Sequence, residues 1–235
     1  LEPGYTETMG MPLAEADAHD IRDLLLDSNG LLWIATGAGV RVKESPTLDL
    51  AHYTADATSL PGDNVFSLAE DRDGGIWAGT DDAGVARFEA DRWTLPILID
   101  LLPSPGVPKV VADESGMVWI GTDLGLVGYS LDTEKLSQIP ELAGQTIKAL
   151  EIDSTNRLWV ASSRSSETGE HDALITRIIH SASGYTVQQE PLLDVFGGEQ
   201  LPHKFELSFS PDYRFPGGMW LAIDQEGLFY WDGST

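Results

Sequence analysis

The feature of this sequence that most constrains its fold is a repeat that can be phased on its tryptophans. Successive copies are separated by 44, 42, 40 and 61 residues and are marked by Trp33, Trp77, Trp119, Trp159 and Trp220. A period of about 40–45 residues, with several short strands in each unit, is typical of the blades of a β-propeller. Helical solenoids of similar period need long stretches with a 3.6-residue apolar periodicity, and the sequence has none. The repeat therefore predicts an all-β fold, a propeller of about five four-stranded antiparallel blades.

The strands within a repeat can be placed by residue type. In the second copy, β-branched, aromatic and aliphatic residues form four short runs that are separated by turn residues: VFSLAE, GIWAGT, GVARFEA and WTLPILI. Such runs are typical of strands. We expect the chain to be a single domain, 1–235, whose repeats span approximately 15–54, 58–99, 103–139, 143–190 and 200–235.

The turn between the first and second strands of a repeat, the A–B turn, has its own pattern of aspartate, glycine and tryptophan three residues apart. The aspartate carboxylate can accept hydrogen bonds from nearby backbone amides, and glycine supplies the positive φ of a tight hairpin. The fourth copy has asparagine in place of glycine, and asparagine tolerates this left-handed region. Large rings at one position in every blade are expected to fill the space between sheets. We assign structural roles to Asp27, Gly30, Trp33, Asp71, Gly74, Trp77, Asp113, Gly116, Trp119, Asp153, Asn156, Trp159 and Trp220.

Charge and composition exclude several classes of function. The formal net charge is −24, from 14 basic and 38 acidic residues. Such a surface repels phosphate backbones and anionic lipid head groups, so we expect no nucleic-acid partner and no direct membrane contact. The chain has no cysteine, which excludes disulfides, thiolate metal sites and a cysteine nucleophile. No signal peptide is visible at its N-terminus.

Motifs for metal binding and catalysis are missing from the sequence. The five histidines do not have the spacing of metal ligands, and the turn aspartates lack the further ligands of a calcium-binding loop. No phosphate-binding loop, dinucleotide fingerprint or Gly-x-Ser-x-Gly motif occurs. We therefore expect no metal, no cofactor and no catalytic residue, and the sequence favours a non-enzymatic role over an enzyme.

The period is broken in two places, which are the predicted binding region. The loop from Ser162 to Ala173 and the connection from Leu192 to Lys204 are much longer than their counterparts in the other repeats. In a four-stranded blade these two kinds of connection emerge on the same face, so we expect both segments to converge there. The residues that could bind a ligand on this face are His171, Asp172, Glu199 and His203.

The stretch from Thr58 to Phe88 resembles the two-component regulator propeller repeat. It has a Leu-Pro pair before the first strand, the Asp-Gly turn, the Trp-x-Gly-Thr strand end and the following glycine-led strand. The resemblance implies a sensor domain outside the cytoplasmic membrane, periplasmic or extracellular, like those of hybrid histidine kinase-type receptors. It implies a small-molecule or saccharide ligand, and either a homodimer or further signalling domains of a larger receptor as partners.

Closure and function each have a favoured prediction and alternatives. The favoured arrangement is a closed ring in which residues Leu1–Thr6 complete the last blade; the alternative is a partial arc of a seven-bladed propeller. The favoured function is a non-enzymatic ligand-binding or sensing module. The alternatives are a scaffold or dimerisation propeller, and a propeller lyase or glycosidase-like enzyme, because fold alone does not determine function.

Overall fold

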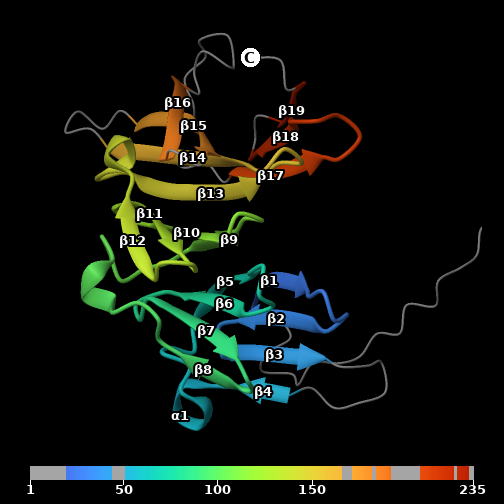
Figure 1. The fold of residues 1–235 in the computed structure, drawn as a ribbon, viewed down its shortest axis with the longest axis vertical. Coiled ribbons are helices and arrows are strands. Elements are labelled where there is room, and N and C mark those ends of the chain that lie inside the picture. Colours follow the sequence, from blue (N-terminus) through green and yellow to red (C-terminus); the bar gives the residue numbers. More distant parts are fainter. Residues whose placement is uncertain are drawn as a thin grey trace, which may run out of the picture.

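Five antiparallel sheets, or blades, follow one another around a central cavity in the computed structural model, which describes residues 20–43, 51–165, 171–181, 184–191, 207–224 and 227–232 (Figure 1). Four blades have four strands each, and the fifth has three strands in the described part of the chain. In every blade the strands pair in the order in which they occur in the sequence. The predicted fold class, an all-β propeller, is confirmed.

The strands are short, and each hairpin joins neighbours in the sequence. Blade 1 contains β1 (Ile21–Leu26), β2 (Leu32–Thr36), β3 (Gly39–Lys43) and β4 (Ala51–Tyr53). Blade 2 contains β5 (Val65–Glu70), β6 (Ile76–Thr80), β7 (Val85–Glu89) and β8 (Arg92–Thr94), preceded by the helix α1 (Ala55–Thr58). Blade 3 contains β9 (Lys109–Ala112), β10 (Met117–Thr122), β11 (Gly125–Ser130) and β12 (Lys135–Gln138). Blade 4 contains β13 (Thr146–Ile152), β14 (Arg157–Ser165), β15 (His171–Ser181) and β16 (Gly184–Pro191), and blade 5 contains β17 (Leu207–Asp212), β18 (Gly218–Ile223) and β19 (Gly227–Trp231).

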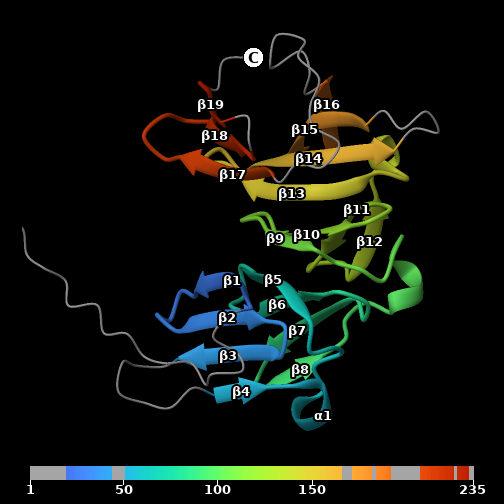
Figure 2. The ribbon, with the colours of Figure 1, turned by 180° about the vertical axis from the view of Figure 1, so that it is seen from behind.

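The first strand of each blade is the innermost one. Along the chain, β1 contacts β5, β5 contacts β9, β9 contacts β13 and β13 contacts β17 (Figures 1 and 2). Blades 1 and 5 are the two ends of this series. Residues Leu1–Thr6, which were expected to complete the last blade, lie outside the described residues, so this means of closure stays a prediction.

Tryptophan side chains fill the spaces between neighbouring blades. Trp33, Trp77, Trp119 and Trp159 are at most 3% exposed. Each belongs to a core cluster shared with the next blade along the chain; Trp33, for example, meets Phe88 of blade 2 with ring centroids 5.1 Å apart. These contacts are the main apolar burial available between sheets of a propeller.

Trp220 in blade 5 points away from the preceding blade, as Trp119 does in blade 3, but it belongs to no core cluster of the described residues. Its neighbours Met219 and Leu221 face the core cluster shared with blade 4, so alternation along the strand places Trp220 on the other face of the sheet. There it packs against Tyr230, with ring centroids 4.6 Å apart, and remains partly exposed.

The long loop predicted from Ser162 to Ala173 is wrong at both of its ends. Strand β14 continues to Ser165 and β15 begins at His171, and the backbone of Arg164 pairs with that of Asp172. Extending the ladder supplies hydrogen-bond partners for backbone groups that a loop would leave to water. Residues 166–170 and the whole second predicted segment, 192–204, lie outside the described residues.

Candidate functional site

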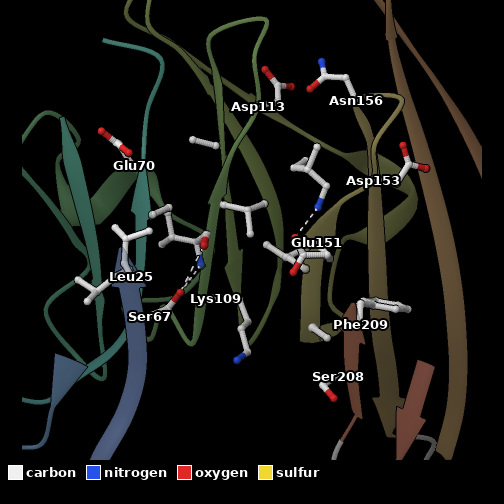
Figure 3. A pocket seen from close by; sticks show the side chains of 18 of the residues that line it. Leu25, Ser67, Glu70, Lys109, Asp113, Glu151, Asp153, Asn156, Ser208 and Phe209 are labelled. Carbon is white, nitrogen blue, oxygen red and sulfur yellow. Dashed lines mark hydrogen bonds between the residues drawn. The ribbon is translucent and has the colours of Figure 1, made fainter. Parts of the chain in front are cut away.

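The innermost strands of all five blades line a cavity of about 960 Å³ (Figure 3). Its wall contains residues of β1, β5, β9, β13 and β17, and the A–B turns of blades 3, 4 and 5 surround one end. A second hollow, of about 690 Å³, adjoins it and shares Lys109, Leu207 and Ser208. A concave site with a few convergent polar groups is where a propeller can hold a small ligand.

One position of the repeat faces this cavity in every blade. It lies four residues before the A–B turn aspartate, and we call it the inner position. Its occupants all line the cavity and differ in chemistry: Asp23, Ser67, Lys109, Ala149 and Ser208.

In blades 1 and 2 the inner position ties one blade to the next. Asp23 Oδ2 accepts a hydrogen bond of 2.8 Å from the Leu68 amide. Ser67 Oγ accepts a bond of 3.0 Å from the Val110 amide and donates to the Val110 carbonyl oxygen. The pairing register shifts just before Asp23 and Ser67, and such irregularities redirect a side chain from its strand. These two side chains are therefore partly structural.

Lys109 occupies the inner position of blade 3 and has no such bond. Its amino group makes no hydrogen bond or ion pair with any residue that the structure describes, and Figure 3 shows the side chain extending into the cavity. Its positive charge acts on both Asp23 and Glu151, which line the same cavity. Lys109 thus offers three hydrogen-bond donors at the centre of the ring.

Two of the carboxyls that line the cavity, those of Asp23 and Glu151, have raised pKa values. Burial raises the pKa of Asp23 above its ordinary value of 3.8, and its bonds from the Leu68 and Leu24 amides and the charge of Lys109 only partly offset this. Burial likewise raises the pKa of Glu151 above 4.5, and the negative charge of Asp23 adds to that increase. Carboxyls with raised pKa values in a cavity are typical of functional sites, although structural networks also produce them.

The carboxylates of the A–B turns have a different environment. In blades 1 to 4, Oδ1 of the turn aspartate accepts bonds from the amides two and four residues later, at 2.8–3.1 Å. Oδ2 accepts a bond of 2.7–3.1 Å from the indole N–H of the tryptophan six residues later. Sequence reasoning had treated the aspartate and the tryptophan as separate structural features, whereas here one carboxylate fixes both the turn and the ring.

Arginines reinforce two of these turns. Arg87 Nε donates to Asp71 Oδ2 at 2.7 Å, and Arg157 Nε donates to Asp153 Oδ2 at 2.7 Å. Burial alone would raise the pKa of Asp71, but bonds from Arg87 and Trp77 outweigh it, so the pKa falls below 3.8. The pKa of Asp153 falls for the same kind of reason.

The glycine position of these turns is left-handed in all four blades. Gly30, Gly74 and Gly116 have φ between 82° and 89°, and Asn156 has φ of 60°. Asn156 also accepts a hydrogen bond of 3.2 Å from the Glu114 amide in the A–B turn of blade 3.

Hydrogen bonds join the A–B turns of successive blades, from blade 1 to blade 5, at one end of the cavity. The Ser28 amide donates to Glu70 at 2.7 Å, and Arg72 Nη1 donates to the Ser115 carbonyl at 2.8 Å. The Asn156–Glu114 bond joins blades 3 and 4. The last link runs from the Gly217 amide to Ser154 Oγ, at 3.2 Å. We call this chain of turns the rim.

The predicted binding residues are not brought together in the described part of the molecule. His171 and Asp172 begin strand β15, at the end of a long hairpin. Glu199 and His203 lie outside the described residues. Sequence reasoning missed the inner position, which becomes visible only when the repeats are aligned on the turn aspartate.

The described residues contain no group of three or more histidine, aspartate or glutamate side chains placed to hold a metal ion. Among the helices that the structure describes, none is long and apolar enough to cross a membrane.

The geometry defines a β-propeller with a polar central cavity, and two stretches of the sequence match a known repeat family. Residues 17–38 and 59–82 match the model of the family described as "Two component regulator propeller". The resemblance to the two-component regulator propeller repeat that the sequence predicts is thus confirmed over these two stretches. No protein of curated function matches the chain.

Solved structures with the same fold include extracellular domains of two component and one component systems. The extracellular domain of a hybrid two component system from B. thetaiotaomicron is 20% identical, with a TM-score of 0.71 over 97% of this chain and 30% of that one. Another, assigned to a one component system of the same organism, is 19% identical, with a TM-score of 0.67 over 90% of this chain and 27% of that one. A GH74 enzyme from Niastella koreensis is 14% identical, with a TM-score of 0.63 over 89% of this chain and 36% of that one. At these identities the similarity shows the fold alone, and the chain spans roughly a third of each structure.

Proposed function

We propose that the chain is a non-enzymatic sensing module in which a saccharide binds in the central cavity. The observation that carries the proposal is the amino group of Lys109, which bonds to none of the described residues, within a cavity that the carboxyls of Asp23 and Glu151 also line. Sugar hydroxyls can accept bonds from an ammonium group and donate to carboxylates, so these groups suit a polyhydroxylated ligand. A purely structural inner position would be expected to resemble Asp23 or Ser67, which bond to the next blade.

The proposal also covers location and partners. The similarity to extracellular domains of two-component-type sensors supports a place outside the cytoplasmic membrane, either periplasmic or extracellular. In such a receptor, the signalling partners would be further domains of a larger chain or a second copy of it. A scaffold or dimerisation propeller would not require an uncommitted lysine in the cavity.

Isothermal titration calorimetry with neutral oligosaccharides tests the proposal. The variant Lys109→Met keeps the aliphatic stem and removes the charge. We expect it to bind about tenfold more weakly or worse, because hydrogen bonds to charged groups contribute about 1.5–3 kcal/mol. Lys135→Met, on the outer strand β12, is the matched control and should bind like the unmodified chain. Equal affinity of both variants, or no binding of any oligosaccharide to the unmodified chain, would contradict the proposal.

A glycoside hydrolase is the second candidate, favoured by the two cavity carboxyls with raised pKa values. Glycosidases use an acid and a base or nucleophile, one of which often has a raised pKa. Incubating the chain with the same oligosaccharides and analysing the products by chromatography distinguishes the two functions. Release of shorter sugars by the unmodified chain, lost in Glu151→Gln, would establish hydrolysis in place of simple binding.

A further inference from the structure

Blade 5 has an A–B turn that departs from the pattern of the other blades. Its turn aspartate is Asp212, which precedes Trp220 by eight residues, whereas the corresponding distance is six residues in blades 1 to 4. The enlarged turn contains two aromatic residues, Tyr213 and Phe215. No aromatic residue occurs between aspartate and tryptophan in the other four turns.

Both aromatic side chains are exposed at the rim. Tyr213 is 78% exposed and Phe215 is 54% exposed. Tyr213 nevertheless lines the central cavity, together with rim residues of blade 4 such as Thr155 and Asn156. Most large rings in the described part of the chain are buried between blades, so packing does not explain why Tyr213 is where it is.

The turn that holds Tyr213 is fixed on both sides. Arg214 donates two hydrogen bonds of 2.8 Å to Asp212, and the Phe215 amide donates to the Asp212 carbonyl at 3.1 Å. At the other end, Arg157 Nη2 donates to the Gly217 carbonyl at 3.1 Å, in addition to the bond from Gly217 to Ser154. A ring presented by a preorganised turn loses little conformational entropy when it binds a ligand.

We infer that Tyr213 is a stacking platform for one sugar ring at the mouth of the central cavity. The inference deepens the proposed function and rests on it. An exposed tyrosine offers a flat apolar face to the C–H face of a pyranose, while its hydroxyl stays in water. The bound sugar chain would extend from Tyr213 at the rim towards Lys109 inside.

The charges around the mouth narrow the class of saccharide. Glu70, Asp113, Glu114 and Asp153 line the cavity at its rim end, as Figure 3 shows for three of them. The chain as a whole is strongly acidic. Like charges disfavour an anionic ligand at such a mouth, so the site selects neutral sugars over uronic acids.

Calorimetric titrations with cellotetraose, xylotetraose, arabinotetraose and tetragalacturonate test this inference. We expect Tyr213→Ala to weaken binding of a neutral tetrasaccharide about tenfold, and Tyr213→Phe to keep affinity within about threefold, because the ring is retained. Tyr185→Ala is the matched control, since Tyr185 lies on the outer strand β16. Tetragalacturonate should bind more weakly than every neutral probe that binds.

The outcomes separate this inference from the proposed function. If Lys109→Met loses binding while Tyr213→Ala binds like the unmodified chain, the inference that Tyr213 stacks on a sugar is wrong and the proposed sensing function stands. If Tyr213→Ala and Tyr213→Phe weaken binding equally, the hydroxyl rather than the ring is responsible, and stacking is wrong. If none of the four probes binds the unmodified chain, the proposed function itself fails.

Discussion

The A–B turns and the wall of the central cavity both contain buried carboxyl groups, yet the pKa values of these groups move in opposite directions. Asp71 and Asp153 have lowered pKa values, whereas Asp23 and Glu151 have raised ones. Desolvation raises the pKa in all four cases. The difference is that the turn carboxylates receive hydrogen bonds from backbone amides, an indole and an arginine, which stabilise the charged form.

The opposite pKa shifts distinguish the structural carboxylates of the A–B turns from the carboxyls of the candidate site. A turn aspartate has its oxygen atoms occupied by partners within the fold, so it has little capacity left for a ligand. Glu151 accepts only one bond from a described residue, at 3.1 Å from the Ile152 amide. Polar groups whose hydrogen-bonding capacity is not filled within the fold are the ones that can bond to a ligand.

The largest difference between the two regions is expected in stability. Asp71→Ala should lower the free energy of unfolding by about 3–5 kcal/mol, because it leaves the buried Trp77 indole and the Arg87 guanidinium without their partner. Denaturant unfolding followed by tryptophan fluorescence measures the effect. Asp73→Ala is the matched control: it lies in the same turn, is exposed, and should cost less than about 1 kcal/mol. Similar costs for both variants would show that the turn carboxylate is not a structural centre.

The A–B turns could be predicted from the sequence because the interactions that stabilise them require particular residue types at fixed spacing. The turn needs a carboxylate, a left-handed residue and a ring at fixed spacing, so Asp71, Gly74 and Trp77 recur in similar form and can be read as a pattern. Even Asn156 could be interpreted, because few residues tolerate its conformation. The bond from aspartate to indole could not be predicted, since it depends on how the hairpin folds back over its own strand.

The candidate site could not be predicted from the sequence because the residue at the inner position differs from one repeat to the next. At the inner position Asp23, Ser67 and Lys109 look like unrelated substitutions on a strand. Only the ring brings them to one cavity. Conversely, the break in the period after Ser162 suggested a loop, but added residues there extend the hairpin of β14 and β15. Length alone does not distinguish a longer loop from a longer ladder.

A smaller effect is expected at the left-handed position of the turn. Gly74 has φ of 82°, and a Cβ atom added there would meet no atom within 4 Å, so any cost is conformational. Gly74→Ala should cost about 1 kcal/mol. Gly74→Asn should cost less, because asparagine occupies the same position in blade 4. Chemical denaturation of the two variants measures the difference, and an alanine variant as stable as the asparagine variant would contradict this account.

The smallest effect, and the one that compares the two regions most directly, is the pH dependence of stability. The pKa of Glu151 is raised on folding, so the folded chain binds its proton more tightly than the unfolded chain does. The stability that Glu151 contributes is therefore fully present below its ordinary value of 4.5 and is lost as the pH rises through the folded value. Asp71 acts in the opposite sense: its contribution is present above 3.8 and is lost as the pH falls.

Glu151→Gln should therefore change how the free energy of unfolding varies with pH more than it changes its average value. The amide cannot ionise, so the variant should gain stability relative to the unmodified chain as the pH rises from about 4 to 8. Urea unfolding at each pH measures this difference, and Glu141→Gln, at an exposed position between β12 and β13, is the control that should leave the curve close to its original shape. A relative loss of stability by Glu151→Gln at neutral pH would mean that the Glu151 carboxylate is satisfied within the fold, like Asp71. The cavity wall would then be scaffold as well, and the contrast between the two regions would be wrong.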